Sequence, residues 1–191
     1  MKKYTIILVL AAMLLLTGCG YNQMVTNREN VNAAWGQVEN MYQRRANLIP
    51  NIVETVKGYA THEQETLTAV IEARSRATAI TATPENMEAM QEYMDAQGDF
   101  GNAISRMLMV TESYPQLQAN ALYADLIHEL EGTENRISVA IMDYNNTVRT
   151  HNTMIQKFPY IIYSGMLGFQ KITYFESKEG ADVAPVVDFS K

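Results

Sequence analysis

Apolar side chains recur at alternating spacings of three and four residues through most of this chain, the pattern of helices that pack lengthwise on other helices. The first seam covers residues 24–57, and Pro50 predicts a kink within it because its ring removes one backbone donor. A second amphipathic segment covers residues 62–80. No alternating strand pattern competes before residue 160, so these segments indicate helices.

Two further helices are predicted downstream. Thr83 suits the N-cap and Pro84 the first helical position, which predicts a helix from 84 to about 112. The last seam runs from about 116 to 157. We expect one helix through Gly132 there, rather than two helices divided at this glycine.

The short connections between these segments predict an all-α fold, an antiparallel four-helix bundle with long first and last helices. Antiparallel pairing of those two helices brings residue 24 beside residue 158. The 47% hydrophobic content is ample for a core. With a single cysteine in the chain, no intrachain disulfide can contribute.

The N-terminus has the pattern of a lipoprotein signal peptide. Lys2 and Lys3 precede an apolar run over residues 6–16, and Leu-Thr-Gly-Cys then ends at Cys19, which resembles a bacterial lipobox. Residues 1–18 are therefore predicted to be a signal peptide, with a lipid thioether on the Cys19 sulfur. The apolar run is shorter than the roughly 20 residues of a spanning helix, so a short retained helix or a plain cleaved signal is the weaker alternative.

This interpretation divides the chain and gives it a location. The predicted parts are 1–18 signal peptide, 19–23 lipidated tether, 24–158 helical bundle and 159–191 apolar, then irregular, tail. The protein is expected to be a membrane-anchored lipoprotein of the cell envelope that faces the periplasm or the cell exterior. Gly20 favours an outer membrane, where one exists, because it is not the acidic residue that often retains lipoproteins at the inner membrane.

Charge excludes one class of partner. Without Lys2 and Lys3 the chain has 13 basic and 21 acidic residues, a net charge of −8. Such an acidic domain is a poor candidate for binding nucleic acid or anionic lipid headgroups. No nucleic-acid partner is expected.

Several polar and proline-containing segments carry a family likeness, and their order and spacing resemble the LemA family of bacterial envelope proteins. The segments are VNAAW at 31–35, RRANLIPNIVETVKGYA at 44–60, ELEGTENRI at 129–137, DYN at 143–145 and FP at 158–159. The resemblance implies a helical bundle with an N-terminal membrane anchor, no established enzymatic activity and a partner among envelope proteins. Three features depart from the family pattern: the lipobox in place of a transmembrane anchor, Asn47 in place of an acidic residue, and Ile141 in place of an arginine.

Catalytic and metal-binding motifs are incomplete. His62 and Glu63 begin a zincin-like HExxH pattern, but position 66 is Thr66 where a second histidine is required. The other histidines, His128 and His151, are far from His62 in sequence, and a metal site that combines them with glutamates is the open alternative. No nucleophile elbow or phosphate-binding glycine loop is present, so no catalytic, cofactor or metal residue is predicted.

Arg45 is the polar residue that most affects the predicted packing. It occupies a seam position, where an unpaired charge is costly. The antiparallel arrangement places it near Glu134 or Glu131, and we predict an ion pair of Arg45 with Glu134 that fixes helix register. An anion-binding arginine is the functional alternative.

The apolar segment 158–169 is the candidate contact surface. It contains Ile161, Ile162, Tyr163, Met166 and Leu167. The segment either caps the end of the bundle or contacts the bilayer or a partner. Contact with the bilayer is suggested because aromatic residues favour the membrane interface and the antiparallel pairing of the first and last helices brings the segment back beside the anchor.

These observations predict a lipid-anchored, non-catalytic interaction or scaffold protein of the cell envelope. The alternative is a ligand sensor or hydrolase with a site inside the bundle. A deep polar pocket with converging carboxylates would favour the alternative, whereas an exposed apolar strip would favour an interaction protein.

Overall fold

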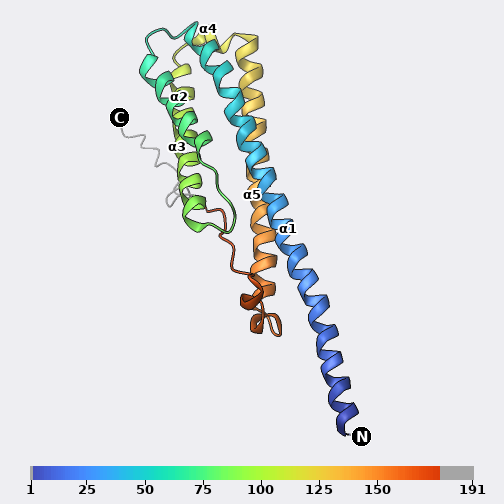
Figure 1. Cartoon of the computed structure of the whole chain (residues 1–191). Helices are drawn as coiled ribbons and strands as arrows, with labels where there is room; N and C mark the ends of the chain where they lie inside the picture. Colours follow the sequence, from blue (N-terminus) through green and yellow to red (C-terminus); the bar gives the residue numbers. More distant parts are fainter. Residues whose placement is uncertain (1, 177–191) are drawn as a thin grey trace, which may run out of the picture.

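The computed structural model describes residues 2–176, with side chains described from residue 20 onward. The described chain is helical and contains no strand, as its periodicity predicts (Figure 1). The elements are α1 (Lys2–Lys57), α2 (Gln64–Ala79), α3 (Met87–Thr111), α4 (Pro115–Gln118), α5 (Ala121–Gln156) and two 3₁₀ turns, η1 (Tyr160–Ile162) and η2 (Gly165–Leu167).

The helices form two antiparallel pairs. The long helices α1 and α5 lie side by side, and α2 and α3 form a shorter hairpin beside the half of α1 that is distant from the N-terminus (Figure 1). The lower part of α1 extends beyond α2 and α3; α5 and the two 3₁₀ turns lie beside its upper stretch, and its first turns continue alone beyond them. α1 continues through Pro50 and ends at Lys57, where the pattern predicts its end.

The predicted start of α3 was wrong. The helix begins at Met87, not at Pro84, and its N-cap is Asn86, whose side chain accepts a hydrogen bond from the Ala89 backbone N at 3.1 Å. Pro84 instead lies in a turn closed by the hydrogen bond from Asn86 N to Thr83 O. Proline suits this turn as well as a helix start, and asparagine is among the strongest N-caps.

α5 is one helix through Gly132, as predicted. Its start differs from the expectation, because residues 115–118 form the separate short helix α4. Asn120 then caps α5 by accepting a hydrogen bond from the Tyr123 backbone N at 3.0 Å.

The core consists of two main apolar clusters. One lies among α1, α2, α3 and the first half of α5, and it includes Ile49, Phe100 and Leu130. The other surrounds Trp35 of α1 and includes Tyr144 of α5. Burial of these side chains supplies the main driving force for folding.

Ile172 and Phe175, in the segment that follows η2, pack into the second cluster, a contact that the sequence pattern did not predict. Two asparagines of α5 hold this segment. Asn152 and Asn145 each bond both backbone groups of one residue, Ile172 and Phe175 respectively, at 2.8–2.9 Å. The irregular tail predicted from residue 180 onward lies outside the described residues.

Candidate functional site

A cluster of exposed apolar side chains, which we call the foot, lies just after the end of α5. It consists of Phe158, Ile161, Ile162, Met166 and Leu167. Phe158 is 80% exposed and Met166 is 88% exposed. Single exposed apolar residues are common, but a cluster of this kind indicates a contact surface.

The foot is held by a tightly bonded loop. Ser164 is buried, and its hydroxyl donates a hydrogen bond to Ile155 O at 3.1 Å. The backbone N of Phe169 in turn donates to Ser164 O at 3.0 Å. Gly168, at a φ of +78°, permits the left-handed turn that ends η2. The loop therefore buries Phe169 and directs the foot outward.

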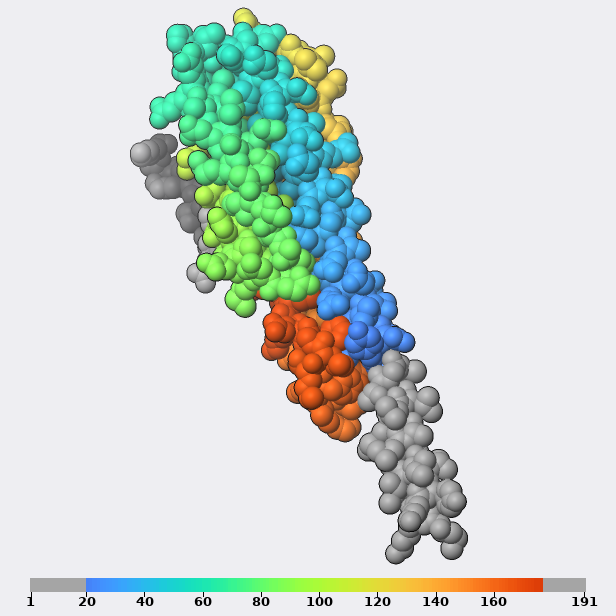
Figure 2. Space-filling model, viewed as in Figure 1, coloured from blue at the N-terminus to red at the C-terminus, as the bar shows by residue number. Residues whose placement is uncertain are grey.

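The foot lies against the part of α1 that directly follows Cys19. Figure 2 shows the orange and red foot segment beside the blue start of the described side chains. A Cβ atom added at Gly20 would lie 2.6 Å from Tyr160 Cε1 and from Tyr163 Oη, so only glycine permits this approach. Met24 also packs with Ile155 and Phe169.

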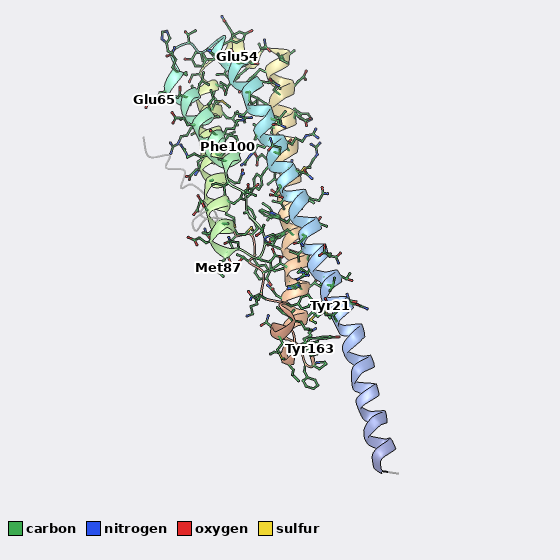
Figure 3. The ribbon with its side chains drawn as sticks, viewed as in Figure 1. Tyr21, Glu54, Glu65, Met87, Phe100 and Tyr163 are labelled. Carbon is green, nitrogen blue, oxygen red and sulfur yellow. The ribbon has the colours of Figure 1, made fainter. Side chains whose placement is uncertain are left out.

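The predicted contact residues do not all point the same way. Ile161, Ile162, Met166 and Leu167 are exposed. Tyr163 instead packs edge-on against Tyr160, with ring centroids 6.0 Å apart, on the side of α1 near Tyr21 (Figure 3). The side chain of Cys19 lies outside the described side chains.

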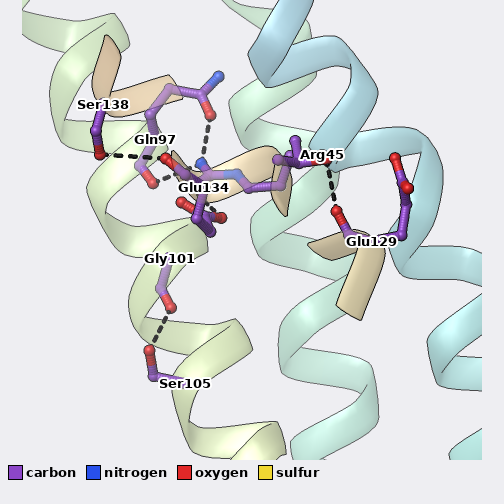
Figure 4. Close-up of polar contacts among 8 residues, drawn as sticks. Arg45, Gln97, Gly101, Ser105, Glu129, Glu134 and Ser138 are labelled. Atoms are coloured by element: carbon purple, nitrogen blue, oxygen red, sulfur yellow. Dashed lines mark hydrogen bonds and ion pairs between the residues drawn. The ribbon is translucent and has the colours of Figure 1, made fainter. Parts of the chain in front are cut away.

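Arg45 forms the main buried polar network (Figure 4). Its Nη1 lies 3.3 Å from Glu134 Oε1, the ion pair expected between these two residues. Its Nη2 donates to both the backbone oxygen and the side-chain oxygen of Gln97, at 3.1 and 2.8 Å. The guanidinium also lies over the rings of Tyr42 and Phe100, at 4.8 and 5.0 Å from their centroids.

Gln97 is the partner that sequence reasoning missed. It is buried, and its Nε2 donates to Ala77 O at 3.2 Å, so the network joins α1, α2, α3 and α5. The signal was present in the chain, because Gln97 continues the seam of Met90 and Met94 at a spacing of three. Protein acceptors occupy both terminal nitrogens of Arg45, which disfavours a free anion site there.

The three histidines lie in different surroundings. His151 is buried, and its Nε2 lies 3.0 Å from Gln170 O. His62 and His128 are exposed. Within the described residues, no three histidine, cysteine, aspartate or glutamate side chains are grouped to hold a metal ion.

An open groove, the outer groove, lies between α1 and α5 and has a volume of about 610 Å³. Its floor and walls include Ala33, Ala34 and Val139, and Arg136 and Asp143 add one charge of each sign. Val139 is exposed, as is its neighbour Met142. Glu129 lies near Arg136 and Arg44, and the Arg44 guanidinium lowers the pKa of this carboxyl.

Among the helices of the described chain, none has an apolar stretch long enough to cross a membrane.

Comparison with known proteins gives a consistent family. A family model described as the LemA family matches residues 34–189. The magnetosome proteins MamQ 1 and MamQ 2 of Paramagnetospirillum magneticum are each 29% identical over 186 residues, covering 87% of this chain and 68% of the relative. Protein LemA of Metamycoplasma hominis is 22% identical over 158 residues, covering 83% of this chain and 69% of the relative.

Proposed function

This chain belongs to the LemA family, and we propose that it is a lipid-anchored, non-catalytic interaction protein of the cell envelope. In this proposal a lipid on Cys19 holds the protein at the membrane. The foot contacts the bilayer, and the helices of the bundle present a surface to a partner protein. Membership in the LemA family supports association with the membrane of the cell envelope.

The position of the foot is the main support for this proposal. Tyr160 and Tyr163 pack on Gly20, the residue that directly follows Cys19. Any membrane anchor at Cys19 therefore brings the exposed side chains of Ile161 and Met166 to the same bilayer. Apolar and aromatic side chains are stabilised at that depth.

We further propose that α1, α2, α3 and α5 act together as one antiparallel four-helix bundle. Two features support this arrangement. The first core cluster contains residues from all four helices. Arg45 and its partners Gln97 and Glu134 lie on α1, α3 and α5, and Gln97 reaches the end of α2. A rigid body of this kind can present a fixed surface away from the membrane.

The outer groove is the proposed partner surface, and its occupant is an amphipathic helix of another envelope protein. The groove is largely apolar, as helix-in-groove recognition requires. Arg136 and Asp143 are seven residues apart on α5. A partner helix with a basic and an acidic residue at the same spacing would pair with Asp143 and add a second carboxylate to Arg136, which already lies 3.6 Å from Glu129.

Photo-crosslinking in intact cells tests this proposal. A photoreactive side chain in place of Val139 is expected to capture an envelope protein, and Cys19→Ala should abolish the capture while the fold is retained. Exposed Ile71 on α2 is the matched control position. Equal capture at both positions, or capture of only a second copy of this chain, would contradict a partner helix in the outer groove.

A further inference from the structure

Positive charge is concentrated at the end of the molecule that carries the foot. Residues 144–175 include Arg149, Lys157 and Lys171 but no aspartate or glutamate. The excess of acidic residues therefore lies elsewhere in the chain. The expectation that anionic headgroups are excluded follows from the net charge, but it does not apply to this end.

Two of these cations line a second groove, which we call the basic groove. It lies between α1 and the last turns of α5 and has a volume of about 500 Å³. The lining contains no carboxylate. Its lining residues are Gln23, Asn27, Arg149, Thr150, Thr153, Met154, Lys157 and Tyr160.

The two cations are the donors of the basic groove that a ligand can reach, because the amides of Gln23 and Asn27 and the Thr150 hydroxyl already donate within the protein. Within the described residues Lys157 has no ion-pair partner, and Arg149 donates one hydrogen bond, from Nη2 to Asn146 Oδ1 at 3.0 Å. Arg149 lies on α5, and Lys157 directly follows the last residue of α5, eight residues further along the chain, which is about 12 Å along a helix. Hydroxyl groups of Thr150 and Thr153 lie between them in sequence.

The basic groove directly adjoins the foot. Lys157 precedes Phe158 in the chain, and Tyr160 both lines the groove and packs on Gly20. The apolar foot and the cationic groove are therefore successive along the same surface. A phospholipid has the same order, with acyl chains followed by a phosphate.

We propose that the basic groove binds the phosphate-bearing headgroup of an anionic glycerophospholipid while the foot contacts its acyl chains. Arginine and lysine both bind phosphate oxygens through charge-assisted hydrogen bonds. The hydroxyl groups of Thr153 and Tyr160, which also line the groove, add donors for a headgroup alcohol. This proposal rests on the proposed function, because it requires the foot to face the bilayer.

Native mass spectrometry of the full-length protein, purified in mild detergent, tests the proposal. The protein is offered equal amounts of phosphatidylglycerol and phosphatidylcholine, and retention of phosphatidylglycerol is expected to dominate. Retention of phosphatidylglycerol should fall about fivefold for each cation removed in Arg149→Gln and Lys157→Gln. Arg106→Gln, at an exposed position of α3, is the matched control and should retain the preference.

Further measurements distinguish a lipid-headgroup site from a site for free phosphate. Inorganic phosphate at millimolar concentration should not displace the lipid, and full displacement would show a free-phosphate site instead. Equal retention of both lipids, or an unchanged preference in the double variant, would overturn the headgroup site but leave the proposed bilayer contact standing. Retention of neither lipid would contradict both proposals.

Discussion

The side-chain amide of Asn152 pairs with both backbone polar groups of Ile172. Asn152 Nδ2 donates to Ile172 O at 2.8 Å, and Ile172 N donates to Asn152 Oδ1 at 2.9 Å. All of these groups are buried. A helix side chain thus substitutes for a neighbouring strand and fixes the segment that follows the foot.

Asn152→Ala is expected to lower the free energy of unfolding by about 1–3 kcal/mol. The substitution leaves the N–H and C=O groups of Ile172 buried without partners, and such groups keep their full desolvation cost. Urea unfolding followed by circular dichroism measures the effect. Asn102→Ala, at an exposed position of α3, should change stability by less than about 0.5 kcal/mol. Equal effects of the two substitutions would show that Asn152 does not hold the segment.

Arg45→Met is expected to destabilise the protein by about 2 kcal/mol, because the two oxygens of Gln97 lose their donor in the core. Glu134 loses less, since its side chain is 45% exposed. Arg44→Met provides the comparison, because Arg44 pairs with Glu129 at the surface and such pairs contribute about 1 kcal/mol or less. A neutral result for Arg45→Met would contradict the role of Arg45 in fixing helix register.

Alkaline pH is expected to weaken the fold through Tyr42. Burial raises the pKa of the Tyr42 hydroxyl from 10.0 to about 12. The folded state therefore holds this proton more tightly than the unfolded state does. Its contribution is fully present below pH 10 and is lost as the pH rises towards 12, with a loss of about 1.4 kcal/mol by pH 11.

The Tyr42→Phe variant isolates this contribution. Unfolding free energies at pH 8 and pH 11 should differ less in the variant than in the native protein, by about the same 1.4 kcal/mol. Burial also raises the pKa values of Tyr93 and Tyr144, so part of the alkaline loss should persist in the variant. An identical pH dependence in both proteins would contradict the burial of the Tyr42 hydroxyl.

Gly20→Ala is expected to loosen the loop that carries the foot. The added Cβ would lie 2.6 Å from Tyr160 Cε1 and from the Tyr163 hydroxyl oxygen, and such overpacking typically costs about 1–3 kcal/mol. Hydrogen exchange of the amides in residues 160–164 should accelerate. Gly36→Ala is the control, since a Cβ at Gly36 meets no atom within 4 Å and alanine favours the helix. Unchanged exchange in Gly20→Ala would show that the loop does not rest on α1.

The long helices could be predicted from the sequence because each buries one regular stripe of side chains. The boundary near Met87 could not be predicted, because Pro84 suits either a turn or a helix start and the local sequence does not decide between them. The role of Asn152 could not be predicted either, since its partner Ile172 lies 20 residues away and is bonded through backbone atoms.

Part of the candidate site could likewise be predicted from the sequence, and part could not. The apolar composition of residues 158–169 predicted a surface near the Cys19 end of the bundle, and the foot lies there. Tyr163 was expected to share that exposure, but it packs towards Gly20, because a glycine on α1 leaves room for its ring. The basic groove could not be predicted from the sequence. Its charge depends on where the acidic residues lie in the fold, and they lie away from Arg149 and Lys157, whereas the sequence showed only the negative net charge.

Depth-dependent fluorescence quenching shows whether the foot contacts the bilayer. The full-length protein carrying M166W is placed in lipid nanodiscs that contain brominated acyl chains, and L122W, an exposed position at the opposite end of α5, provides the reference. Native Trp35 is buried and supplies a constant background in both proteins. If the foot contacts the bilayer, the indole added in M166W is strongly quenched and the indole added in L122W is not quenched. Equal, weak quenching in both proteins would contradict this contact.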